Sequence, residues 1–509
     1  MRQQGKQGVE GFIESASARC STISPAPGRT LCPYWEPKIP LAVPLRAHFL
    51  LLVLKQHLRP TLLLAYPVVL SQLGHILVGV CDSVMVGQTG TVPLAAVSVG
   101  VSTTSVLMML GIGLSMGAVP LVAAADGRHD TPALRRLLVS TVWLCTLAGL
   151  GLVGLAELMP RLMPHLGQVP AVVTLATPWM RVVGWSLLPL MVFQGFREFA
   201  EGLGLTRQAM VLSIGANVVN ALLCYAFIFG HWGAPRMGLM GSARATLIAR
   251  ILMAVLMAGY VLRAERLRPY RAAAAAWLRP DGAVLRRLLA LGAPIGGQMM
   301  FEIGAFAASA LMIGWLGAAP LAAHQVAINV AATTYMAASG IAAAATIRVG
   351  RLRGAGDAAG ARQAGFAAYW LVFGFMGSMG VLLILARHFI PHFYTHDPTV
   401  VAQAGTLLLI AAGFQVSDGL QVVGLGALRG LEDVKVPSLV ALGAYWVVAL
   451  PLGYFLGFRL HLGAPGVWLA LLLGLSIVAA MLLLRFRRET QPGALLPAAP
   501  APRAALLEA

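Results

Sequence analysis

Acidic side chains are rare in the apolar stretches of this sequence, and three of them stand out. Asp82, Glu302 and Asp418 each lie inside a run of hydrophobic residues. An ionised side chain at the centre of a bilayer costs about 2.5–3.5 kcal/mol on insertion scales. A carboxylate that is retained there usually handles an ion or a substrate, because a bound proton or cation neutralises it. We therefore interpret these three residues as candidate cation-coupling groups.

Each carboxylate also has a simpler interpretation. Asp82 would reach water if it lies near the end of its helix, whereas Glu302 and Asp418 would form hydrogen bonds between helices. Glu302 lies deep in its apolar stretch, eight residues after Pro294. If Glu302 and Asp418 lie together, two carboxylates in a low dielectric would attract a sodium ion or share a proton.

Several neutral polar residues are candidates for supporting roles. Asn217 and Asn220 are spaced i, i+3, on one helix face, so either would assist Asp82 or bond a neighbouring helix. Gln194, Gln298 and Gln415 are candidate substrate-lining residues.

Other charged residues near the ends of apolar stretches are interpreted as loop ion pairs. These are Glu198 and Glu201 beside Arg197, and Glu432 and Asp433 beside Arg429.

The elements that must position these residues are membrane-spanning helices. The 509 residues are 58% hydrophobic and 11% charged, against about 25% charged in soluble proteins. Windows such as Ser83–Ala125 contain no charged residue, and about 20 residues cross the hydrocarbon core. Hydropathy predicts an all-α polytopic protein with twelve spans: 60–86, 98–124, 137–158, 170–195, 208–230, 238–263, 288–316, 325–347, 364–387, 399–425, 436–458 and 463–485.

The distribution of basic residues predicts the topology. The net charge is +18, but the arginines gather in alternate loops rather than in one nucleic-acid-binding patch. Basic loops follow the second, sixth and eighth spans, so both termini are expected on the cytoplasmic side. The predicted organisation is a flexible cytoplasmic extension (1–59), a six-helix lobe (60–263), a cytoplasmic linker (264–287), a second six-helix lobe (288–485) and a disordered tail (486–509).

The cysteines and histidines do not suggest a cofactor. The five cysteines are scattered, without zinc or redox spacing. Neither a Ser/His/Asp set nor a phosphate-binding loop is present, and the chain has no room for a nucleotide-binding domain. We expect no catalytic residues, no resident metal or cofactor, and no nucleic-acid partner.

The two halves of the sequence repeat one another. A shift of 227 positions places Pro67 on Pro294 and continues without a gap through the second span. It pairs Gly90 with Gly317, Gly127 with Gly354 and Asp130 with Asp357, and a later shift would pair Arg197 with Arg429. Two six-span halves share one orientation, so the pseudo-twofold axis should lie along the membrane normal and a substrate should bind between the halves.

Three stretches resemble the MATE (multidrug and toxic-compound extrusion) transporters, in their NorM-like branch. They are residues 67–100, 294–329 with its Leu-Ala-Ala-His-Gln run, and 415–437. The resemblance spans about residues 60–485. It implies a V-shaped pair of lobes in a bacterial inner membrane. It also implies export of cationic or amphipathic compounds in exchange for sodium ions or protons, with acidic residues at the positions of Asp82, Glu302 and Asp418.

Two other functions remain open at this point. A lipid-linked-oligosaccharide flippase of the same superfamily would need a basic cavity, and few basic residues lie within the predicted spans. An integral-membrane enzyme would need a polar catalytic cluster at the membrane interface. We expect a monomer whose partners are a small-molecule substrate and membrane lipid.

Overall fold

The computed structural model describes residues 43–162, 170–271, 274–277 and 279–491, which form helices and connecting turns without a strand. The chain divides into two compact units, Met1–Leu50 and Leu51–Ala509, and the second contains the packed helices. Within the described residues, twelve helices or helix pairs are long and apolar enough to cross a membrane. Each overlaps one predicted span, which confirms the predicted fold class.

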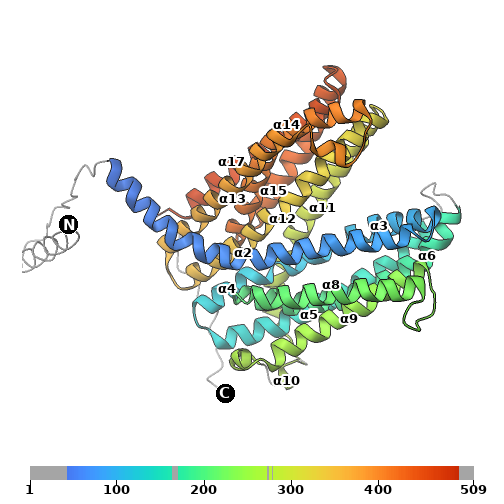
Figure 1. Ribbon diagram of the computed structural model, residues 1–509. Coiled ribbons are helices and arrows are strands. Elements are labelled where there is room, and N and C mark those ends of the chain that lie inside the picture. Colours follow the sequence, from blue (N-terminus) through green and yellow to red (C-terminus); the bar gives the residue numbers. More distant parts are fainter. Residues whose placement is uncertain (1–42, 163–169, 272–273, 278, 492–509) are drawn as a thin grey trace, which may run out of the picture. The chain divides into compact units, whose positions relative to one another are not determined.

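The helices follow the predicted order in two successive sets. The first set comprises α2 (Val43–Gly87), α3 (Thr91–Ser115), α4 (Ala118–Gly127), α5 (Thr131–Leu162), α6 (Pro170–Trp185), α7 (Leu187–Gly202), α8 (Thr206–Phe229) and α9 (Leu239–Arg263). The second comprises α11 (Gly282–Gly314), α12 (Ala318–Gly354), α13 (Ala358–Ala386), α14 (Pro398–Gly430), α15 (Lys435–Gly443), α16 (Leu450–Tyr454) and α17 (Gly463–Glu489). Figure 1 shows the two sets, coloured blue to green and yellow to red.

Each set of helices has its own apolar core. In the first half, residues such as Leu138, Met191 and Phe199 pack together and are almost fully buried. In the second half, Phe414 and Trp468 are almost fully buried in a separate apolar cluster. We call these halves the N-lobe and the C-lobe.

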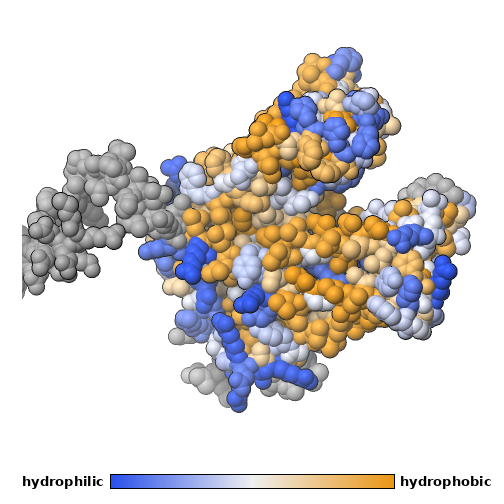
Figure 2. Space-filling model, in the orientation of Figure 1, coloured by the Kyte–Doolittle hydropathy of each residue, from blue (hydrophilic) through white to orange (hydrophobic). Residues whose placement is uncertain are grey.

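The outer surface of the helices is apolar. Large hydrophobic side chains are exposed along them, including Leu77, Val84, Leu147, Leu385 and Leu484. In Figure 2 orange residues cover the lengths of the helices, and blue residues gather toward their ends. Contiguous exposed apolar surface of this extent requires lipid rather than water around it.

Backbone geometry shows that the sequence repeat is a structural repeat. Gly90 and Gly317, which precede α3 and α12, both have φ in the left-handed range, 135° and 122°. Asp130 Oδ1 accepts a hydrogen bond from Ala133 N at the start of α5, and Asp357 caps α13 in the same way. Paired residues therefore perform the same local task in both lobes.

The lobes meet closely where α4 crosses α12. A Cβ on Gly127 would lie 2.0 Å from Arg351 O, and one on Gly354 would lie 2.1 Å from Ala124 O. Each contact is the repeat image of the other, because Ala124 pairs with Arg351. The two helices therefore cross on the pseudo-twofold axis, and only glycine permits this backbone approach.

The predicted pairing of Arg197 with Arg429 is wrong by one helical turn. The turns that follow α7 and α14 contain Gly204 (φ 78°) and Glu432 (φ 62°). Aligning these turns pairs Arg429 with Glu201 instead. Both sequences have an arginine near the helix end, and that similarity misled the alignment where no gap-free match constrained it.

The predicted boundaries differ from the structure at three places. The helix α2 reaches back to Val43, into the predicted extension, and residues 1–42 lie outside the described residues. The linker contains η2 (Glu265–Tyr270) and α10 (Ala274–Trp277), and α11 already begins at Gly282, where Asp281 caps it. The helix α17 continues to Glu489, and residues 492–509 lie outside the described part.

Candidate functional site

A cavity of about 760 Å³ lies between the lobes. Helices α2, α3, α4, α6, α7, α8 and α9 line one side, and α11, α12 and α14 line the other. Its wall is mostly apolar, with residues such as Met108, Val183 and Phe306. A volume in the range of about 300–1,000 Å³ accommodates a drug-sized molecule.

The wall contains all three candidate carboxylates. Asp82 comes from α2 in the N-lobe, whereas Glu302 of α11 and Asp418 of α14 come from the C-lobe. Asp418 is 5% exposed, and Glu302 is close enough to interact with it electrostatically. Among the described residues, no hydrogen-bond donor is bonded to the Asp418 carboxylate. It therefore retains its capacity to bind a proton or cation.

Two residues that were not predicted hold Glu302 in place. Gln421 Nε2 donates to Glu302 Oε1 at 3.3 Å, from one turn after Asp418 on α14. The Tyr445 hydroxyl lies 3.2 Å from the same oxygen and 3.0 Å from Gln421 Oε1. Neutral polar residues in apolar stretches are common, so no sequence pattern distinguishes these two from the others.

The carboxylate of the N-lobe is held by an asparagine. With its amide oriented to satisfy both atoms, Asn220 donates to Asp82 Oδ1 at 3.2 Å and accepts from Thr246 N at 3.3 Å. Asn220 therefore contacts Asp82 through its amide nitrogen. Asn217 also lines the cavity, and its Nδ2 has no partner among the described residues.

The glutamine candidates separate into two groups. Gln194 and Gln298 line the cavity, and each accepts a hydrogen bond from an arginine, Arg197 and Arg429 respectively. Gln415 is 1% exposed and lies off the cavity wall, and neither of its amide atoms has a partner among the described residues.

The supposed loop charges at the end of α7 are part of the cavity. Arg197, Glu198 and Glu201 are 8%, 4% and 6% exposed and line its wall, as does Arg429 of α14. We call these four residues the floor of the cavity. The last turns of α7 and α14 turn inward at the face that carries the basic loops, a tertiary feature that hydropathy does not report.

The charges on the cavity wall favour a cationic ligand. Five carboxylates line it, from Asp82, Glu198, Glu201, Glu302 and Asp418, against three guanidinium groups, from Arg197, Arg250 and Arg429. Arg197 is already paired, because its Nε donates to Glu201 Oε1 at 2.6 Å.

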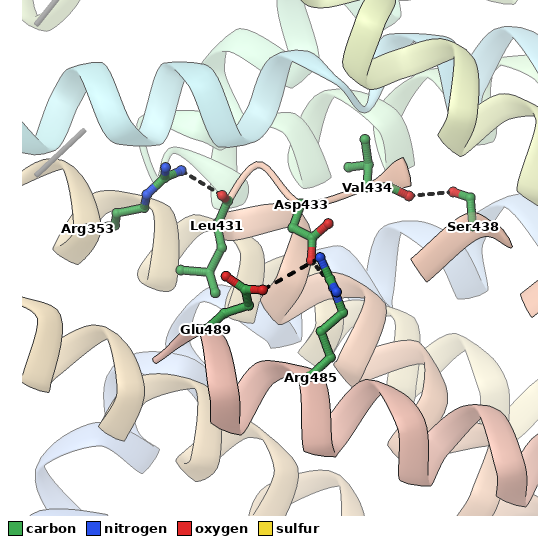
Figure 3. A network of polar contacts seen from close by, with 7 residues as sticks. All are labelled: Arg353, Leu431, Asp433, Val434, Ser438, Arg485 and Glu489. Carbon is green, nitrogen blue, oxygen red and sulfur yellow. Dashed lines mark hydrogen bonds and ion pairs between the residues drawn. The ribbon is translucent and has the colours of Figure 1, made fainter. Parts of the chain in front are cut away.

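Other predicted ion pairs lie in the turn between α14 and α15, outside the cavity. Figure 3 shows Asp433 bonded to Arg485 of α17, which also pairs with Glu489, and Arg353 of α12 donating to Leu431 O. Glu432 pairs with Arg353 and with Arg287 of α11. The predicted ion-pair role therefore holds for Glu432 and Asp433, with partners from distant helices.

Comparison with known proteins finds one family of transporters over nearly the whole helical part of the chain. The MatE family model matches residues 67–226 and 294–455, and these segments begin at the two prolines that the repeat pairs. The probable multidrug resistance protein NorM of Rhodopseudomonas palustris is 38% identical over 436 residues, covering 85% of this chain and 92% of its own. That of Rhizobium meliloti is 33% identical over 448 residues, covering 87% and 96%.

Solved structures share the fold. The crystal structure of the eukaryotic MATE transporter AtDTX14 superposes with a TM-score of 0.77 at 19% identity, covering 86% of this chain and 98% of its own. An outward-facing conformation of a multidrug resistance MATE family transporter gives a TM-score of 0.78 at 18% identity, covering 85% and 95%.

Proposed function

Because the chain belongs to the MatE family, we propose that it is a secondary active antiporter. It exports small amphipathic or cationic compounds, such as drugs and dyes, in exchange for sodium ions or protons. The observation that carries this proposal is the cavity between the lobes, whose apolar wall bears more carboxylates than guanidinium groups. An apolar wall suits an aromatic cargo, and the excess of acid suits a positive charge. The similarity to proteins named as multidrug resistance proteins supports the proposal.

The carboxylates supply the coupling. A proton or sodium ion at Glu302 and Asp418, or at Asp82, neutralises charge inside the membrane and favours one arrangement of the lobes, whereas the cargo favours the other. An inward-moving cation releases about 2.3 kcal/mol per charge per 100 mV of membrane potential. Exchange follows because cation and cargo stabilise different arrangements.

We propose a bacterial inner-membrane location with both termini cytoplasmic. Arginines follow α4, α9 and α12, which all end at one face of the membrane, and this bias supports a cytoplasmic position for that face. The cavity floor lies toward the same face, so with this orientation we propose an outward-facing state that is closed on its cytoplasmic side.

The flippase alternative is less well supported. A pyrophosphate needs a cavity with an excess of positive charge. Here carboxylates outnumber arginines, and Arg197 is paired with Glu201. We also propose that the protein is not an enzyme, since the named relatives are described as resistance proteins and the cavity suits binding and release.

An efflux assay tests the proposed function. Ethidium fluorescence is followed in proteoliposomes that contain the wild type or the double variant Glu302→Gln, Asp418→Asn, after a pulse of sodium or of acid. The wild type should export ethidium in response to at least one pulse, and the double variant should not.

A matched variant controls for the loss of acidic groups. Asp397→Asn makes the same change at the start of α14, outside the cavity, where asparagine also caps a helix. It should behave as the wild type. Unchanged ethidium export by a well-expressed double variant would reject the assignment of the coupling groups.

A further inference from the structure

Arg429 is the least firmly bonded of the three arginines on the cavity wall. It is 9% exposed, and its one hydrogen bond within the described residues joins Nη2 to Gln298 Oε1 at the long distance of 3.5 Å. Its Nε has no partner. By contrast, Arg250 donates to Ser186 Oγ at 2.7 Å and Arg197 to Glu201 at 2.6 Å. A buried guanidinium group with unused donors is free to change partners.

Two carboxyl groups in different lobes lie within electrostatic range of Arg429. One is Glu302 of the C-lobe, and the other is Glu198 of the N-lobe. Gln298 connects Arg429 to the first of them, because it lies one turn before Glu302 on α11. Arg429 is thus placed between the proposed coupling pair and the opposite lobe.

Glu198 is a poorly bonded carboxyl group on the floor. Its one hydrogen bond within the described residues comes from Ser115 Oγ at 3.5 Å. The same hydroxyl lies 2.7 Å from Ile112 O, which is the better acceptor. Arg197 acts on Glu198 electrostatically, but its hydrogen bonds go to Glu201 and Gln194. Glu198 therefore has capacity for a cation from the C-lobe.

The lobes also approach each other closely near the floor. Just beyond it, α4 and α12 cross at Gly127 and Gly354, and Asp126 of the N-lobe pairs with Arg351 of the C-lobe at 3.0 Å. A rotation of one lobe against the other would change the separation of Glu198 and Arg429. The strength of their attraction thus contributes to holding the floor closed.

From these contacts we infer that Arg429 is a shared counter-ion that links cation binding in the C-lobe to closure of the cavity floor. While no cation is bound and Glu302 is ionised, Glu302 attracts Arg429 and weakens the attraction of Arg429 to Glu198. When a cation neutralises the pair, Glu198 becomes the stronger partner and draws the lobes together at the floor. Arg429 is a positioning residue here, because it acts through the carboxylates rather than on the cargo. The inference rests on the proposed antiport function.

A double-mutant cycle on cation binding tests this role. Sodium affinity is measured by titration calorimetry, and proton uptake with a pH indicator, on the purified full-length protein. The variant Glu198→Gln should weaken binding of the coupling cation by about fivefold or more, the range of typical coupling between separate sites. The variant Arg429→Gln should strengthen binding, because it removes a positive charge that competes with the cation.

The decisive comparison is made in the Arg429→Gln background. If Glu198 acts on the coupling pair only through Arg429, then adding Glu198→Gln there should change the cation affinity by less than about twofold. A merely structural role for either residue would not produce this non-additivity. The variant Arg429→Lys should restore part of the coupling, because it retains the charge.

Controls separate the possible failures. Glu489→Gln removes an exposed carboxylate of α17 and should leave the affinity unchanged. Each variant must elute as the wild type does on size-exclusion chromatography. If Glu198→Gln misfolds, Glu198→Asp takes its place, because aspartate keeps the negative charge on a side chain that reaches less far toward Arg429. A wild type that binds neither cation overturns the proposed function and this inference with it. Suppose instead that the wild type binds a cation, but Glu198→Gln leaves the cation affinity unchanged or changes it equally with and without Arg429. That result refutes the role of Arg429 as a shared counter-ion and leaves the proposed function standing.

Discussion

Replacing Gly354 by alanine should open the floor of the cavity. The added Cβ would lie 2.1 Å from Ala124 O, whereas ordinary contact begins at 3.4 Å. The helix α12 must therefore retreat from α4 by about 1.3 Å, since a backbone carbonyl within a helix has little freedom to move. Overpacking of this kind costs about 1–3 kcal/mol. The clash destabilises only the state in which the floor is closed, because α4 and α12 are apart when it is open. The ratio of open to closed states should therefore rise about 5- to 150-fold.

Cysteine accessibility measures this shift. Thr346 lines the cavity near the floor and is 6% exposed, so Thr346→Cys places a small reporter there. In a background without the native cysteines, a membrane-impermeant maleimide is added from the basic-loop face. The Gly354→Ala variant should label faster by the factor above, and its efflux should slow because the closed state is less populated.

The structure offers a matched control and a repeat-related partner. At Gly377 of α13 a Cβ would meet no atom within 4 Å, so Gly377→Ala should change nothing. Gly127→Ala should act as Gly354→Ala does, because its Cβ would lie 2.0 Å from Arg351 O. Equal labelling rates for Gly354→Ala and Gly377→Ala would refute the view that this crossing closes the floor.

Three further changes should have distinct results. Asp82→Asn should reduce coupled efflux in proteoliposomes without changing the melting temperature, because the amide still bonds Asn220; a normal efflux rate would remove Asp82 from the coupling groups. Glu201→Gln should destabilise the protein by about 3–5 kcal/mol, because it leaves Arg197 buried and unpaired, and an unchanged thermal midpoint would show that water reaches this pair. Asp357→Ala should cost about 1 kcal/mol through loss of the cap on α13, and thermal unfolding that matches the wild type would contradict that cost.

The membrane helices could be predicted well from the sequence, because each one is marked by a run of neighbouring apolar residues. Each span is a long apolar run, and the gap-free repeat from Pro67 and Pro294 fixed the division into lobes. The positions of Asp82, Glu302 and Asp418 could also be selected, since a charge in an apolar run is conspicuous. All three line the cavity.

What escaped prediction depends on how helix ends pack. Glu198 and Arg429 lie beside loop residues in the sequence, so they resembled solvated ion pairs, yet the inward turn of α7 and α14 buries them. Tyr445 could not be selected either, because one tyrosine in an apolar helix is unremarkable until its hydroxyl is seen beside Glu302. Contacts between distant helices are not encoded in any single window of sequence.

Cargo-driven ion movement tests the account most directly. Proteoliposomes are loaded with ethidium, no ion gradient is imposed, and the flux of sodium and of protons into the lumen is recorded as ethidium leaves. The account predicts an opposing cation flux that scales with ethidium exit in the wild type and is lost in the variant Glu302→Gln, Asp418→Asn. Ethidium exit from the wild type without any cation counterflow, or equal counterflow in that variant, would contradict it.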